Sequence, residues 1–347
     1  MFIQNKELEK PLIQGGMGVG VSLGNLAGSV AACGAMGVIS TANIGFMEED
    51  FYKNPIEASK RAMKEEVIKA KKLSKGKGLI GINAMVATVL YEEMIEASIE
   101  AGIDCIISGA GLPLKLPAIV GESTVLLAPI VSSGKATTLI NRYWDKNYKR
   151  VADFIVIEGA KAGGHLGFSN EELFSNTNKT VEELLIEVKE AIKPYEEKYG
   201  KYIPVFVAGG LTTRDKIEDI MTKGADGVQV GARFIATEEC DATLEYKNVY
   251  VNATDEDVIL LSSPVGMPAR AIKTPFIERL SVEGRIKPTR CVNCIHTCDP
   301  AVTKYCITKA LIEAQQGNYN EGLFFCDTNP SSIGGIVSVE ELITELM

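Results

Sequence analysis

The sequence predicts a closed (β/α)8 barrel, the TIM-barrel architecture, on two observations. Eight short apolar runs occur between residues 11 and 230, and charged stretches with helical periodicity separate most of them. Continuous apolar runs are typical of strands in parallel sheets, which are buried on both faces. Eight strand and helix repeats favour a barrel over an open sheet, because the eighth strand gives the first one a partner.

The predicted strands and helices follow one another along most of the chain. The strands are expected at residues 11–14, 37–40, 79–83, 105–108, 125–131, 154–157, 204–208 and 227–230. The helical pattern is clearest at 55–73, 89–101, 181–199 and 212–222, and Pro194 is expected to end or kink the third of these early. No linker is evident before about residue 250. We therefore expect residues 1–250 to form the barrel and residues 251–347 to form a flap and a cysteine-rich extension packed on it.

Composition and charge restrict the function classes. The net charge of -9 and the pI near 5.1 argue against nucleic acid or an anionic membrane as partner, since either would need a basic face. The N-terminus has no apolar signal segment, and no stretch approaches a membrane span. We expect a cytoplasmic enzyme with a small-molecule substrate. A homodimer is compatible with the sequence, which does not determine the oligomeric state.

Several common catalytic motifs fail on particular residues. The glycines from Gly16 to Gly24 lack the dinucleotide spacing, and no acid for a ribose follows the second strand. Ser133-Gly134-Lys135 is similar to part of a phosphate loop, but Ala136 replaces the Mg²⁺-binding hydroxyl. There is no G-x-S-x-G elbow and no H-E-x-x-H pair. A redox cofactor is therefore the leading option.

The run from Glu158 to Gly167 is the strongest candidate for the catalytic site. One of only two histidines, His165, lies there, where an apolar strand gives way to a glycine-rich loop. In barrels, the loops after the strands form the functional edge. Gly163, Gly164 and Gly167 are expected to let a flat ligand approach the backbone. The alternative is a structural histidine that caps a turn, but the context favours function.

The loops after the seventh and eighth strands indicate a phosphate site. Ala208-Gly-Gly-Leu-Thr-Thr213 and Val230-Gly-Ala-Arg233 carry few side chains, and barrels commonly bind phosphate at this place. The glycines could instead serve only tight strand-to-helix turns. Because both loops are bare, we favour a flavin phosphate site.

Five segments together resemble the FMN-dependent nitronate monooxygenase family, once called 2-nitropropane dioxygenases, whose close relatives include the flavin-type enoyl-ACP reductases. They are Gln14-Gly-Gly-Met17, Gly81-Ile-Asn83, Ala162-Gly-Gly-His-Leu-Gly167, Ala208-Gly-Gly210 and Gln229-Val-Gly-Ala-Arg-Phe234, and the match spans about residues 1 to 280. The resemblance implies a barrel that contains FMN.

The resemblance also implies roles for particular residues. It implies that His165 is the catalytic base or proton donor. The flavin ring would contact Gly15, Gly16, Met17, Asn83, Gly163 and Gly164. The FMN phosphate would contact Gly209, Gly210, Gly231 and Ala232. Ala232 departs from the threonine often found at its position, which removes one hydroxyl contact to phosphate.

Three activities fit these residues. The first is monooxygenation, in which alkyl nitronates or nitroalkanes react with O₂ to give a carbonyl compound and nitrite, with FMN supplying the electron chemistry. The second is enoyl-ACP or enoyl thioester reduction, with NAD(P)H as co-substrate. The third is a non-catalytic flavin redox sensor. The first is our prediction, and turnover distinguishes it from the third.

The C-terminal segment contains five of the eight cysteines. Cys291-x2-Cys294-x3-Cys298-x7-Cys306 has spacing suited to an iron-sulfur cluster or zinc, and its opening resembles the cluster segment of dienoyl-CoA reductases, though its last interval is shorter. His296 and Cys326 could add ligands. The favoured interpretation is a reduced-thiol loop without metal. Residues 264–275, just before it, are expected to form an ordered active-site flap.

Overall fold

Eight parallel strands form a closed barrel, which confirms the predicted (β/α)8 architecture. The computed structural model describes residues 1–347. Around the barrel the strands follow the order β10-β11-β3-β4-β5-β6-β7-β8. They are β3 (Leu12–Gln14), β4 (Met36–Ser40), β5 (Leu79–Met85), β6 (Cys105–Gly109), β7 (Leu126–Val131), β8 (Ile155–Glu158), β10 (Val205–Ala208) and β11 (Gly227–Val230). The eighth strand, β11, pairs in parallel with the first, β3, as closure requires.

Helices follow each barrel strand and pack on the outside. They are α1 (Gly24–Ala32), α2 (Pro55–Ser74), α3 (Tyr91–Glu100), α4 (Leu116–Val120), α5 (Gly134–Tyr148), α6 (Asn170–Ser175), α7 (Val181–Tyr199), α8 (Arg214–Thr222) and α9 (Ala232–Ile235), with a 3-10 turn η1 (Ile44–Met47) after β4. The four predicted helices are present. None of the helices combines the length and apolar character that a membrane crossing needs.

Pro194 does not end helix α7, which continues to Tyr199. A proline removes the hydrogen bond to the carbonyl four residues earlier, here that of Glu190. Both Pro194 and Glu190 are exposed, so water can satisfy this carbonyl. The prediction of an early end was therefore wrong.

Alternate residues of the strands build two separate cores. Val38, Ile107 and Phe206 belong to the cluster inside the barrel, whereas their neighbours face the helices. The N-terminal hairpin, β1 (Phe2–Ile3) and β2 (Lys6–Glu7), adds Ile3 to this inner cluster. The interior is thus filled with apolar side chains, and a ligand cavity is left to the loops at the carboxyl ends of the strands.

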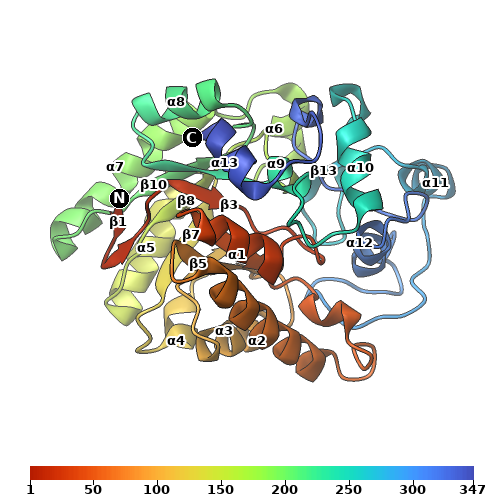
Figure 1. The fold of residues 1–347 in the computed structure, drawn as a ribbon, viewed down its shortest axis with the longest axis horizontal. Coiled ribbons are helices and arrows are strands. Elements are labelled where there is room, and N and C mark those ends of the chain that lie inside the picture. The colour runs from red at the N-terminus through yellow and green to blue at the C-terminus, as the bar shows by residue number, and fades with distance from the viewer.

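The C-terminal third leaves the barrel and returns to it. It contains α10 (Leu244–Asn252), η2 (Asp255–Asp257), β12 (Val258–Ser262), β13 (Pro268–Ile272), α11 (Pro275–Glu283), α12 (Ile307–Gln315), η3 (Pro330–Ser332) and α13 (Val339–Leu346). Figure 1 shows α10, α11 and α12 together on one side of the barrel. The last helix, α13, packs against α1, α8 and α9, and its apolar side chains join the main core. Residues 236–338 therefore form an excursion between the last strand and the helix that completes the outer ring.

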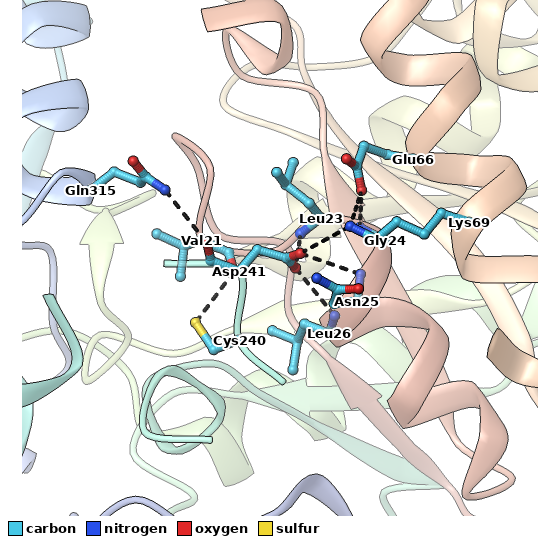
Figure 2. A network of polar contacts seen from close by, with 10 residues as sticks. All are labelled: Val21, Leu23, Gly24, Asn25, Leu26, Glu66, Lys69, Cys240, Asp241 and Gln315. Atoms are coloured by element: carbon cyan, nitrogen blue, oxygen red, sulfur yellow. Dashed lines mark hydrogen bonds and ion pairs between the residues drawn. The ribbon is translucent and has the colours of Figure 1, made fainter. Parts of the chain in front are cut away.

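A buried carboxylate connects this excursion to the barrel (Figure 2). Asp241, from the loop after α9, accepts hydrogen bonds from the backbone N–H groups of Leu23 (2.8 Å), Leu26 (3.2 Å) and Asn25 (3.3 Å) at the start of α1. Its side chain is only 4% exposed, and Lys69 lies 3.8 Å away. Since the first N–H groups of a helix lack partners within it, Asp241 caps α1 from more than 200 residues away.

Candidate active site

A cavity of about 440 Å³ opens at the carboxyl ends of the barrel strands. It is lined by loops that follow several different strands, together with residues from the C-terminal excursion. Every residue for which the sequence implied a cofactor contact lies in its wall: Gly15, Gly16, Met17, Asn83, Gly163, Gly164, Gly209, Gly210, Gly231 and Ala232. His165 lines the same cavity. The structure thus brings segments far apart in sequence to one site.

His165 is held in place by a small antiparallel sheet. It belongs to the two-residue strand β9 (Gly164–His165), which pairs with β13 so that His165 lies opposite Ala269. The sheet contains part of the segment predicted as a flap, and two residues of that segment, Val265 and Met267, line the cavity. The flap is therefore partly a strand that fixes the histidine.

The imidazole of His165 is partly buried in the wall of the cavity. Its Nε2 lies 2.7 Å from the Oγ of Ser263, and its ring meets that of Phe325 edge-on at 5.1 Å. Burial lowers the pKa of His165 to about 4, because the charged form would lose its hydration. The Ser263 hydroxyl can donate to a neutral ring nitrogen or accept from a protonated one. This pair can therefore hold a proton at the edge of the cavity.

Glu158 is a second titratable group in the wall, and the sequence reasoning gave it no role. It ends strand β8, and its Oε2 accepts a hydrogen bond from the backbone N–H of Gly167 at 3.1 Å. Burial raises its pKa to about 7, while this bond and the charge of Arg270 act in the opposite direction. An acid directly after a buried apolar strand was the signal that could have indicated it.

The backbone conformation of the glycines differs between the loops after β10 and β11. Gly209 and Gly210 adopt φ angles of +110° and +78°, which side chains rarely allow. Gly231 has an ordinary φ, and a Cβ built there would meet nothing nearer than the Met17 sulfur at 3.8 Å. The positive φ angles require glycine in the first loop whether or not a phosphate binds there. Gly231 lines the cavity and has free space beside it.

Gly163 lines the cavity, but the side on which a Cβ would stand faces protein. A Cβ at this position would lie 2.6 Å from the backbone carbonyl carbon of Cys326, and one at Gly167 would lie 3.0 Å from the Oγ of Ser132. Gly163 and Gly167 therefore allow the chain to pack closely around His165. Both also line the cavity, so the expectation that they let a flat ligand approach the backbone stays a prediction.

One buried acceptor in the cavity wall lacks a protein partner. The Oε1 of Gln229, on β11, makes no hydrogen bond, although buried carbonyl oxygens are nearly always paired. Its side chain packs against Gly15, whose missing Cβ would lie 3.3 Å from the Cγ of Gln229. An acceptor of this kind fits a ligand that brings an N–H donor, as a flavin ring does.

The fold and the site define a class of protein: a (β/α)8-barrel enzyme whose cavity at the carboxyl ends of the strands carries a partly buried acid–base residue. The comparisons with known proteins agree. The model of the family described as nitronate monooxygenase matches residues 2–347. The chain therefore belongs to the nitronate monooxygenase family, and it is a flavin-dependent oxidoreductase.

Individual relatives are distant. A probable nitronate monooxygenase from Staphylococcus haemolyticus is 25% identical over 301 residues, which cover 82% of this chain and 81% of the relative. A probable nitronate monooxygenase from Staphylococcus saprophyticus is 27% identical over 195 residues. This alignment covers 55% of the present chain and 50% of the relative.

Solved structures share the fold. A nitroalkane oxidase from Streptomyces ansochromogenes superimposes with a TM-score of 0.72 at 18% identity, covering 98% of this chain and 95% of the other. FabK from Thermotoga maritima has a TM-score of 0.70 at 22% identity, with coverages of 98% and 92%. At these identities the likeness concerns the architecture.

Proposed function

We propose that the protein is an FMN-dependent nitronate monooxygenase. It would oxidise alkyl nitronates, and nitroalkanes after their deprotonation, with O₂ to a carbonyl compound and nitrite. Two nitronates and one O₂ then give two carbonyl compounds and two nitrite ions. The observation that carries the proposal is the partly buried His165, whose pKa is lowered, beside the Ser263 hydroxyl in the wall of the cavity.

Gly231, Ala232 and the backbone around Gly209 and Gly210 would hold the FMN phosphate, since these loops end the seventh and eighth strands. Helix α9 has only four residues, so individual N–H groups rather than a helix dipole would bind the anion. Gly15, Gly16, Met17 and Asn83 would face the ring, with the free Oε1 of Gln229 as an acceptor. When bound, FMN supplies the electron transfer between substrate and O₂.

The protein supplies a base and an orientation. Base catalysis requires the tautomer in which Nε2–H donates to the Oγ of Ser263, which leaves Nδ1 free to accept the α-proton of a nitroalkane. Ser263 is itself fixed, because its Oγ accepts a hydrogen bond from the backbone N–H of Val265 at 3.3 Å. Ser263 is thus a positioning residue, and His165 is the catalytic base.

The test compares two reactions of the purified protein. We expect a yellow protein that releases FMN on denaturation, consumes O₂ with an alkyl nitronate and forms nitrite in proportion. The contrasting assay follows NADH oxidation with a crotonyl thioester. Steady NADH-dependent reduction of the thioester, with no nitronate-dependent O₂ uptake, would replace the proposal with enoyl reduction. A colourless protein that fails to bind added FMN would refute both.

A further inference from the structure

Four cysteines line a second cavity, of about 310 Å³, between helix α12 and the loop that precedes it. They are Cys291, Cys294, Cys298 and Cys306, the four of the sequence motif. The two further candidates from the sequence do not belong to this group. Cys326 lies in the wall of the first cavity, and the exposed His296 lines neither cavity. The four thiols of the sequence motif therefore lie around one cavity.

Packing explains only part of this set, because Cys294 and Cys298 contact an apolar cluster whereas Cys291 is exposed. Cysteines that act as small apolar side chains are fully buried, as Cys105 and Cys240 are in this protein. In the second cavity, by contrast, Cys291 is exposed and the other three are only partly buried. All four are free thiols. Their common feature is the space that they surround.

Two of the sulfurs accept hydrogen bonds, as metal-bound thiolates commonly do. The Thr308 hydroxyl donates to the Sγ of Cys294 at 3.0 Å, and the backbone N–H of Asn293 donates to the Sγ of Cys291 at 3.4 Å. The side chain of Asn43 donates to the oxygen of Thr308 at 3.0 Å, so the Thr308 proton is directed at the sulfur. Such donors stabilise negative charge on sulfur.

The second cavity is larger than a single metal ion needs. No three Cys, His, Asp or Glu side chains of the protein are grouped so that they could hold one metal ion. Tetrahedral zinc, with Zn–S bonds of about 2.3 Å, would bring its thiolates to about 3.8 Å from one another. In a [4Fe–4S] cluster each thiolate binds a different iron, so the thiolates lie farther apart than around a single ion.

The charge of the residues that line the second cavity also fits an iron-sulfur cluster. A cluster bound by four thiolates carries net negative charge, and two basic residues, Arg290 and Lys309, line the cavity. The guanidinium of Arg290 lies over the ring of Tyr52 at 5.3 Å, which fixes it beside the cavity. Only one acidic residue, Glu313, lines the same cavity.

We propose that Cys291, Cys294, Cys298 and Cys306 bind a [4Fe–4S] cluster in this second cavity. Cys294 lines both cavities, so the cluster would be a direct neighbour of the flavin site. The proposal does not depend on the nitronate chemistry, because iron and sulfide are measured independently of turnover.

The experiment uses the full chain purified without oxygen and reconstituted with ferrous iron and sulfide. We expect about four iron and four acid-labile sulfide per chain, and an electron paramagnetic resonance signal of a reduced cluster after dithionite treatment. Cys294→Ser and Cys298→Ser should each lose most of the iron and sulfide, and Cys298→Ser, which lies outside the first cavity, should keep the flavin. Cys33→Ser is the matched control, since Cys33 is also partly buried but lies at the end of α1, and it should keep the cluster.

The wild-type chain by itself keeps the proposal falsifiable if a variant fails to fold. Protein without iron after anaerobic reconstitution would overturn it in favour of free thiols. Stoichiometric zinc without iron or sulfide would overturn it as well. Iron that is retained in both Cys294→Ser and Cys298→Ser would place the metal elsewhere.

Discussion

Replacing His165 with alanine should remove most of the activity with neutral nitroalkanes and spare the activity with preformed nitronates. A nitroalkane must lose its α-proton before oxidation, whereas a nitronate has already lost it. General base catalysis typically contributes about 10² to 10⁴-fold, equivalent to about 2.7 to 5.4 kcal/mol of activation free energy. We expect kcat/KM for the nitroalkane to fall by that factor, and kcat/KM for the nitronate to fall less than tenfold.

The structure also predicts the pH dependence of this step. The neutral form of His165 is the base, and burial lowers its pKa to about 4. At pH 5.5 roughly 97% of the imidazole is then neutral, compared with roughly 9% for an ordinary histidine of pKa 6.5. The wild-type kcat/KM for a nitroalkane should therefore stay nearly constant from pH 8 to 5 and decline tenfold per pH unit below about 4.

The assay measures nitrite release with both substrates at the same flavin occupancy. His296→Ala is the matched control, because His296 is the only other histidine and is exposed. His165→Gln tests whether a polar side chain that can bond to Ser263 rescues the geometry without restoring the base. Equal losses with nitroalkane and nitronate would refute the role as base. A wild-type kcat/KM for the nitroalkane that declines through pH 6.5 would refute the lowered pKa of His165.

Three further predictions concern stability and cofactor binding. Glu158→Gln should stabilise the protein by about 2 kcal/mol at pH 8 and leave its stability unchanged at pH 4. The pKa of Glu158 is raised to about 7 in the folded protein, so the wild type loses stability as the pH rises from 4.5 to 7. Urea denaturation at both pH values checks this, and an equal effect at pH 4 would contradict it. Asp241→Ala should lower the free energy of unfolding by about 2 kcal/mol, since three N–H groups at the start of α1 lose their acceptor. A denaturation midpoint equal to that of the wild type would exclude this capping role. Gly231→Leu should abolish FMN binding but preserve the melting temperature of the apoprotein, because its side chain enters open space in the cavity. Gly335→Leu, also in open space but outside the cavity, is its control, and retained FMN in Gly231→Leu would place the phosphate elsewhere.

Much of the barrel could be predicted from local patterns. The strands are short apolar runs buried on both faces, so the approximate positions of all eight follow from the local sequence pattern. The placement of His165 and the two bare loops at one end also follows, because the carboxyl ends of parallel strands necessarily meet at one edge. The early end predicted for α7 was wrong, because the effect of Pro194 depends on whether the carbonyl it leaves unpaired is hydrated.

The tertiary structure decided what depends on contacts between distant residues. Ser263 meets His165 from 98 positions away, and Cys326 explains why residue 163 is glycine. The pKa values of His165 and Glu158 arise from desolvation, which exists only after the chain has closed around them. The sequence by itself therefore determined the barrel and the residues at its functional edge. Packing across long sequence separations decided their partners, their protonation and the grouping of four cysteines around one cavity.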